Sequence, residues 1–176
     1  MISGLLRIGG VMAVATWATA LTAQGTTDNR VGASTDWSVF QETDPVECFS
    51  VSAPRDSTAT RDGEAVEANR SEIQLFVLFR PAASVSGQVA FTGGYPFASG
   101  STVSLDVGGT VFELFTEGEW AWPATPEDDS AIVAAMKRGS DAVVTGQSGR
   151  GTVTKDTFSL SGFTAAVDEA QSRCAS

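Results

Sequence analysis

The side chains in this sequence that could most readily take part in catalysis or binding surround two tryptophans. Trp120 and Trp122 are separated by one residue, and Glu117 and Glu119 precede them in the stretch TEGEWAWPATPEDD. Two carboxylates can hydrolyse a glycoside when they face each other across a sugar, about 5 to 10 Å apart. Glu117 and Glu119, two positions apart in a predicted strand, would project from one face instead. Solvation is therefore the expected role of this pair.

Three further acids, residues 127–129, follow the tryptophans and could contribute to a calcium site or to the start of a helix. The second interpretation accounts for more of the neighbouring sequence. Thr125 is a typical N-cap, Pro126 suits the first turn, and acids are favourable at the positive end of the helix dipole. Two basic residues and Gly139 end the pattern. The sequence thus predicts a helix over 126–138 and no metal site.

The composition excludes the most common combinations of catalytic residues. The chain of 176 residues has no histidine and two cysteines. A Ser/His/Asp or Cys/His site therefore cannot be assembled, and zinc would lack its commonest nitrogen ligand. The formal net charge of −10 disfavours nucleic acid as a partner because phosphate backbones are repelled. We expect no enzymatic activity and no cofactor.

The N-terminus has the pattern of a secretory signal peptide. Arg7 precedes an apolar run over 11–23 that ends in small residues, and cleavage is expected after Ala23, with Ala20 as the alternative. A membrane anchor would need a longer apolar run, of about 18 to 20 residues, so no span is expected in the mature chain. No cysteine follows the signal to carry a lipid. The sequence therefore predicts an exported protein of the periplasm, the cell surface or the medium.

The remaining chain is divided into a flexible polar leader over 24–35 and a single domain over 36–176. Apolar residues at both alternating sets of positions in 72–81 predict a central strand that is covered on both faces. The glycine pair 108–109 between two apolar runs predicts a hairpin. Many short strands with two helices favour a mainly β fold, an antiparallel β-sandwich with two short packed α-helices.

Cys48 and Cys174 both lie in the exported part, where two cysteines most simply pair with each other. Two free thiols, or bridges to other chains, are the alternatives. Cys174 ends an apolar stripe at helical spacing and is expected to face the core. The stripe consists of Phe163, Ala166, Val167, Ala170 and Cys174.

Trp120 and Trp122 would project to the same side of a strand, which leaves two interpretations. They could form a stacking platform for sugar rings, or they could be large anchors buried beneath the helix that follows. We expect at least one tryptophan in the core, because burying an indole stabilises a small domain strongly. The candidate binding surface consists of Trp120, Trp122, Glu117, Glu119 and Tyr95.

Several segments resemble one protein family. They are DWSVF, SLDVGGTVFELF, AAMKRG and, as the most specific part, TFSLSGFTAAVDEA over 157–170. Together they are similar to the invasion-associated locus B (IalB) family, exported proteins of alphaproteobacteria. The stretches WSVFQE and FTEGEWAW lack cysteines that members of the family often carry there. The resemblance implies a non-enzymatic, virulence-related role at the envelope or the host surface, with an unidentified protein or glycan partner. The alternative is a small carbohydrate-active or glycan-binding protein.

Overall fold

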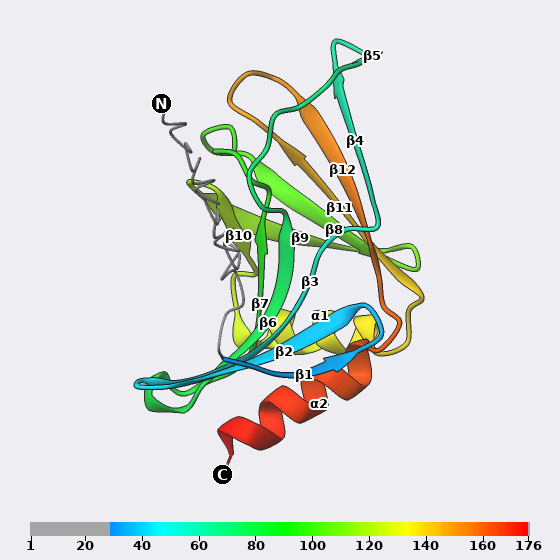
Figure 1. The fold of residues 1–176 in the computed structure, drawn as a ribbon. Helices are drawn as coiled ribbons and strands as arrows, with labels where there is room; N and C mark the ends of the chain where they lie inside the picture. The colour runs from blue at the N-terminus through cyan, green and yellow to red at the C-terminus, as the bar shows by residue number, and fades with distance from the viewer. Residues whose placement is uncertain (1–28, 176) are drawn as a thin grey trace, which may run out of the picture.

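A computed structural model describes residues 29–175 of the chain, and all its strands pair antiparallel in one sheet (Figure 1). The strand order is β1-β2-β3-β6-β7-β10-β9-β8-β11-β12-β4-β5. The elements are β1 (Arg30–Ser34), β2 (Trp37–Thr43), β3 (Val46–Ser52), β4 (Asp56–Arg61), β5 (Glu64–Ala65), β6 (Gln74–Arg80), a 3-10 helix η1 (Pro81–Ala83), β7 (Val85–Thr92), β8 (Thr102–Val107), β9 (Thr110–Glu117), β10 (Trp120–Trp122), α1 (Pro126–Met136), β11 (Asp141–Gln147), β12 (Val153–Ser159) and α2 (Phe163–Cys174).

This arrangement confirms the mainly β, antiparallel class with two packed helices. The two layers expected of a sandwich are joined here, because neighbouring strands pair without a break from β1 to β5. The sheet is strongly bent, so that the half containing β1 to β3 and the half containing β8, β11, β12 and β4 run in different directions (Figure 1). We call the face against which the helices pack the inner face, and the opposite face the outer face.

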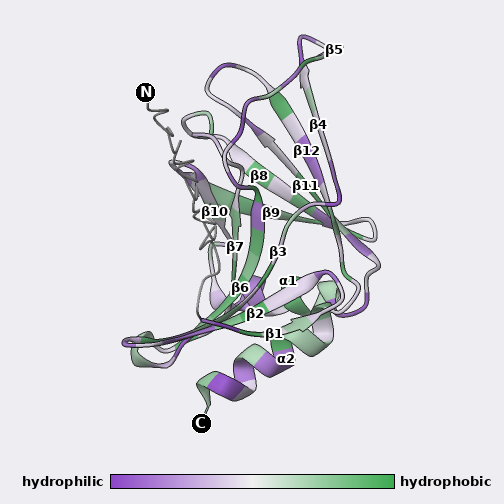
Figure 2. Cartoon of the chain, viewed as in Figure 1, coloured by the Kyte–Doolittle hydropathy of each residue, from purple (hydrophilic) through white to green (hydrophobic). Residues whose placement is uncertain are grey.

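Helix α2 covers the inner face of β1, β2, β3 and β6. All five residues of its predicted apolar stripe are buried, and polar residues occupy its other side (Figure 2). At its start, the Phe163 ring packs edge-on against Trp37 with centroids 4.8 Å apart. Gly162 has φ +86°, and a Cβ at this position would lie 2.0 Å from the Ser34 carbonyl oxygen. Only glycine therefore lets the helix start this close to β1.

Helix α1 forms as its capping residues predict. The Thr125 side chain accepts a hydrogen bond from the Asp128 backbone N–H, and Ile132 and Met136 enter the core. The helix packs mainly against β7. Asp129 in its first turn is buried and accepts a hydrogen bond of 2.8 Å from the Val89 backbone N–H. This carboxylate thereby joins the start of the helix to the sheet.

The β8–β9 hairpin turns at Gly108 and Gly109, as predicted, and both glycines have positive φ. The N-terminal boundary of the fold differs from the prediction. Residues 30–34, assigned from the sequence to a flexible leader, form strand β1 and pair with β2. Strand pairing uses backbone groups, so a polar segment can add to the edge of a sheet without an apolar pattern. The predicted signal peptide, 1–23, lies outside the described residues.

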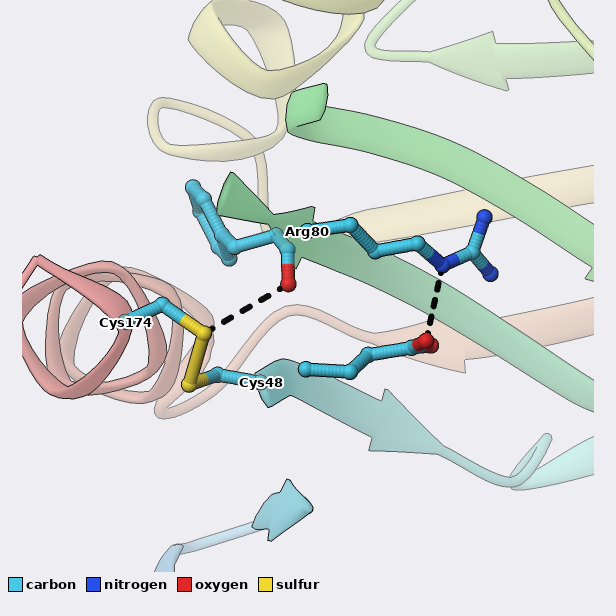
Figure 3. The surroundings of a disulfide bond; sticks show 5 residues. Cys48, Arg80 and Cys174 are labelled. Atoms are coloured by element: carbon cyan, nitrogen blue, oxygen red, sulfur yellow. Dashed lines mark hydrogen bonds and ion pairs between the residues drawn. A yellow bond between two sulfur atoms is a disulfide. The ribbon is translucent and has the colours of Figure 1, made fainter. Parts of the chain in front are cut away.

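The structure contains the predicted disulfide between Cys48 on β3 and Cys174 at the end of α2 (Figure 3). Their Cα atoms are 5.7 Å apart, and 126 positions separate them in the sequence. Both residues are buried. The bond therefore ties the C-terminal helix to the inner face of the sheet near its N-terminal edge.

Candidate functional site

A groove lies on the outer face of the sheet, opposite the helices. It spans β3, β6, β7 and β10 and has a volume of about 500 Å³. Leu78 and Ala90, each 8% exposed, belong to its lining. We call this hollow the outer-face groove. Its lining residues are Glu47, Phe49, Phe76, Leu78, Arg80, Gln88, Ala90, Trp120 and Trp122.

Strand alternation places these side chains. On β6, Leu75, Val77 and Phe79 belong to the helix-covered core, so Phe76 and Leu78 between them must project outward. The apolar pattern of 72–81 was therefore correctly assigned to a central strand. The predicted cover on both faces is wrong for the described part of the chain, since both α-helices pack on the inner side. Periodicity shows that a face is apolar but does not say what packs on it.

Aromatic rings continue across the strands in a row. Phe40 on β2 stacks on Phe49 on β3, with centroids 5.1 Å apart and planes inclined by only 10°. Phe76 lies 6.0 Å beyond Phe49, and Trp120 lies 5.6 Å beyond Phe76. The four rings therefore form a ladder from β2 to β10 along the outer face. Phe40, Phe49 and Phe76 were not among the predicted surface residues, although the alternating apolar pattern of 72–81 indicated an apolar side chain at Phe76 on the second face.

A second hollow adjoins the groove at Trp122 and Gln88, which line both. It extends to the start of α1 and includes Phe115, which is 54% exposed, and Asp129. Phe115 pairs directly with Trp122 in the β9–β10 register. Because of this pairing, apolar surface continues past Trp122.

Burial raises the pKa of the Asp129 carboxyl, with a smaller contribution from Asp128, while the hydrogen bond from the Val89 N–H opposes the shift.

Charged side chains lie at both ends of the outer-face groove. At one end the Arg80 Nε donates to the Glu47 carboxylate at 2.8 Å (Figure 3), and Glu42 lies directly across from Glu47 in the β2–β3 register. At the other end Glu117 lies directly across from Trp120 in the β9–β10 register. An apolar floor thus lies between an Arg80–Glu47 ion pair at one end and the Glu117 carboxylate at the other.

The expectation that one of the two tryptophans enters the core is wrong. Trp120 is 43% exposed and Trp122 is half-buried, whereas Ala121 between them is completely buried. The alternation was predicted correctly, because both indoles share one face, but the small alanine takes the core position. Helix α1 covers the inner face of β7 and inserts its own Ile132 and Met136 there, so it does not cover the indoles.

Tyr95 does not belong to the candidate surface, so its predicted place there is wrong. It packs against the inner core, and its hydroxyl lies 2.6 Å from the Thr154 hydroxyl. The Arg70 guanidinium lies over its ring at 5.2 Å from the centroid and pairs with Asp156. Burial raises the pKa of Tyr95 despite the hydrogen bond to Thr154 and the nearby Arg70. Aromatic type alone did not indicate which face of the sheet this ring occupies.

The two acids of the candidate surface occupy different positions. Glu117 ends β9 and faces Trp120, while Glu119 lies in the turn before β10 and is exposed. The groove itself has one carboxylate in its lining, Glu47, and that group is paired with Arg80. Among residues 29–175, no cluster of three or more acids and cysteines could hold a metal ion. The arrangement is suited to contact with aromatic, apolar and cationic groups.

No helix within 29–175 is both long enough and apolar enough to cross a bilayer.

A family model described as Invasion associated locus B (IalB) protein matches residues 37–171. A comparison with curated proteins finds no match. Among solved structures, the chain is similar to the crystal structure of invasion associated protein B from Bartonella henselae, with a TM-score of 0.55 and 16% identity. That match covers 80% of this chain and 95% of the other, and it shows a common fold.

Proposed function

The chain belongs to the invasion associated locus B (IalB) family, and on this basis we propose that it is an exported, non-enzymatic binding protein that acts in envelope or host-surface interaction. The outer-face groove is the proposed binding surface. One observation carries this assignment: a row of aromatic rings, half-buried at Phe40, Phe49 and Phe76 and exposed at Trp120, lies on the face that neither helix of the described chain covers.

The cost of leaving these rings in water supports the assignment. Each aromatic side chain could bury substantial area at a favourable free energy, and monomeric proteins rarely expose large continuous apolar patches. Interfaces, by contrast, are enriched in tryptophan, tyrosine, phenylalanine and arginine. Trp120, Phe115, Phe76 and Arg80 on one face correspond to that composition.

Export is supported by two features of the chain. The N-terminal residues have the basic, apolar and small-residue order of a signal peptide. The Cys48–Cys174 disulfide joins the only two cysteines of the sequence, and structural disulfides persist mainly in oxidising compartments. Periplasm, cell surface and medium are all compatible with these features.

A glycan-binding function is the second candidate, and the side-by-side orientation of Trp120 and Trp122 favours it. Sugar rings stack on indoles that share one face. The lining of the groove, however, offers few polar side chains to orient hydroxyl groups: Glu47, Arg80 and Gln88. A partner with apolar side chains therefore fits the groove better than a sugar does.

Affinity capture tests the proposed function. The mature chain, with its disulfide intact, serves as bait for the envelope fraction and for host-surface extracts, beside a Phe76→Ser/Trp120→Ser variant. A partner retained by the wild type and lost by the variant would support the groove as the binding surface. A matched variant, Val153→Ser, removes an exposed apolar residue elsewhere on the sheet and should retain the partner. Equal capture by all three baits would contradict the assignment.

Intact-mass measurement tests export. Protein recovered from the envelope or the medium should have the mass of a chain that begins at Gln24. A mass that includes residues 1–23 would contradict cleavage, and recovery from the cytoplasm alone would contradict export.

A further inference from the structure

The charges around the outer-face groove indicate what kind of partner it binds. The six strands β2, β3, β6, β7, β9 and β10 form this part of the sheet. Their outer face carries four acids, Glu42, Glu47, Glu113 and Glu117, of which the first two lie directly opposite each other. Within these strands the only lysine or arginine is Arg80, and it is already paired with Glu47. The surface is therefore apolar at its centre and acidic at the end that carries Glu113 and Glu117, whereas the Glu47 end is balanced by Arg80.

Trp120 and Glu117 form the most specific feature of this surface. Directly opposed residues of an antiparallel pair have Cβ atoms about 4.5 to 5.5 Å apart and project to the same face. An arginine or lysine can stack on an exposed indole, and a carboxylate beside the ring can accept its hydrogen bonds. Trp120 is 43% exposed and Glu117 is also exposed, so both groups are accessible. The pair is thus suited to seat a cationic side chain.

We propose that the groove binds an extended segment of a partner protein that carries apolar or aromatic side chains next to an arginine or lysine residue. This inference rests on the proposed function and adds the chemistry of the partner. The apolar side chains fill the space between Phe49, Phe76 and Trp122, and one cation lies on Trp120 beside Glu117.

The dimensions of the aromatic row suit an extended segment. Its ring centroids are separated in turn by 5.1, 6.0 and 5.6 Å. Alternate side chains of an extended chain lie about 6.6 Å apart on one face, close to these ring-to-ring steps. The groove volume of about 500 Å³ accommodates a few large side chains. A short strand-like segment can therefore place successive apolar side chains against successive rings.

Charge disfavours the other occupants. A second copy would bring the same acidic residues, Glu113 and Glu117, to the interface, and the formal net charge of −10 opposes self-association. Anionic lipid headgroups are repelled for the same reason. Arg30, opposite Phe40 on the edge strand β1, adds one base to the margin of this surface but does not balance the four acids.

The experiment uses a capped synthetic peptide, Arg-Ser-Leu-Ser-Phe-Ser-Arg, whose alternate residues present two arginines and two apolar side chains on one face. Binding to the mature, disulfide-intact chain is measured by calorimetry at low and high salt. One control peptide has glutamate in place of both arginines, and another has serine in place of leucine and phenylalanine. We expect the parent peptide to bind more tightly than either control by about tenfold or more, with an affinity that falls as salt rises.

Two variants of equal charge change locate the site. Glu117→Lys should weaken binding of the parent peptide by about tenfold, because it places a like charge beside the cation. Glu67→Lys, at an exposed position of the loop before β6, should leave binding unchanged. Trp120→Ala should weaken binding to a similar extent. Peptides that bind regardless of charge, or equal weakening by Glu117→Lys and Glu67→Lys, would overturn the proposed partner chemistry.

The outcome separates this inference from the proposed function. If envelope capture depends on Phe76 and Trp120 while the peptide series shows no preference for cations, the groove is a binding surface and only the partner class is wrong. Binding of a neutral oligosaccharide that Trp120→Ala abolishes, together with no binding of the parent peptide, would assign the groove to glycans instead. If neither capture nor any ligand depends on the groove residues, both proposals fail.

Discussion

Asp156 on β12 and Arg70 in the loop before β6 form a two-point ion pair that is closed off from solvent. Arg70 Nη1 donates to Oδ1 at 2.7 Å and Nη2 donates to Oδ2 at 2.6 Å, with the two side chains 7% and 0% exposed. The Ser57 hydroxyl also donates to the Asp156 carboxylate, and Arg70 Nε donates to the Gly93 carbonyl. The loop is thereby held against strands that lie far from it in the sequence.

Removing one partner of this pair should destabilise the domain strongly. Arg70→Ala leaves a completely buried carboxylate without its counterion, and breaking a buried pair in this way typically costs about 3 to 5 kcal/mol. The exposed Lys137–Asp168 pair provides a matched control, since Lys137→Ala should cost less than about 1 kcal/mol. Urea unfolding of both variants measures the difference. Equal losses would mean that the pair is not closed off as the structure indicates.

Loss of the Cys48–Cys174 disulfide should lower stability without changing the fold. The bond closes a loop across 126 positions, for which the chain-entropy estimate is about 4 to 5 kcal/mol, although measured gains often fall short. A Cys48→Ala/Cys174→Ala variant should melt at a lower temperature than the oxidised parent. Reductant should lower the melting temperature of the parent and leave that of the variant unchanged. A parent whose melting temperature does not respond to complete reduction would contradict this role.

Asp129 provides a pH-dependent test. Burial, with a smaller contribution from Asp128, raises its pKa in the folded state, so the folded protein binds this proton more readily than the unfolded chain does. The contribution of Asp129 to the free energy of unfolding is therefore fully present below the ordinary pKa of 3.8 and is lost as pH rises through the raised pKa. Asp129→Asn cannot titrate but keeps an oxygen that can accept from the Val89 N–H.

The parent should therefore gain stability relative to Asp129→Asn as pH falls through this window, because other titrating groups largely cancel in the difference. At neutral pH the asparagine variant should be at least as stable as the parent. Asp129→Ala, which leaves the Val89 N–H without its partner, should cost about 1 to 3 kcal/mol at every pH. Unfolding curves at a series of pH values measure these differences. A parent-to-asparagine difference that is flat across the acidic range would contradict the prediction.

The tryptophans of the groove should respond differently from a core residue. Trp120→Ala should change the free energy of unfolding by less than about 1 kcal/mol, because much of the indole is exposed. Leu114→Ala, at a fully buried position of β9, should cost about 2 to 5 kcal/mol. In a Trp120→Phe/Trp122→Phe variant of the mature chain, Trp37 is the only tryptophan, and its fluorescence should be shielded from quenching by acrylamide. A large loss of stability in Trp120→Ala would contradict the exposed position of this indole and would indicate that it belongs to the core.

Much of the local structure was determined by the sequence itself. Thr125, Pro126 and the acids that follow specify the start of α1, because capping and dipole interactions act within one turn. The stripe that ends at Cys174 specifies the buried face of α2, because spacing along a helix fixes which residues share a side. The disulfide could be predicted because an exported chain with two cysteines has one internal pairing.

Contacts between distant segments were decided only by the tertiary structure. Strand β1 forms through backbone pairing that needs no apolar pattern, and Arg70 meets Asp156 across 86 positions of sequence. The groove illustrates the same limit. Alternation shows that Trp120 and Trp122 share a face, but which face is covered depends on where the helices pack. Because both helices pack on the side to which Ala121 points, the indoles remain on the open side and the groove forms between them and the rings of neighbouring strands.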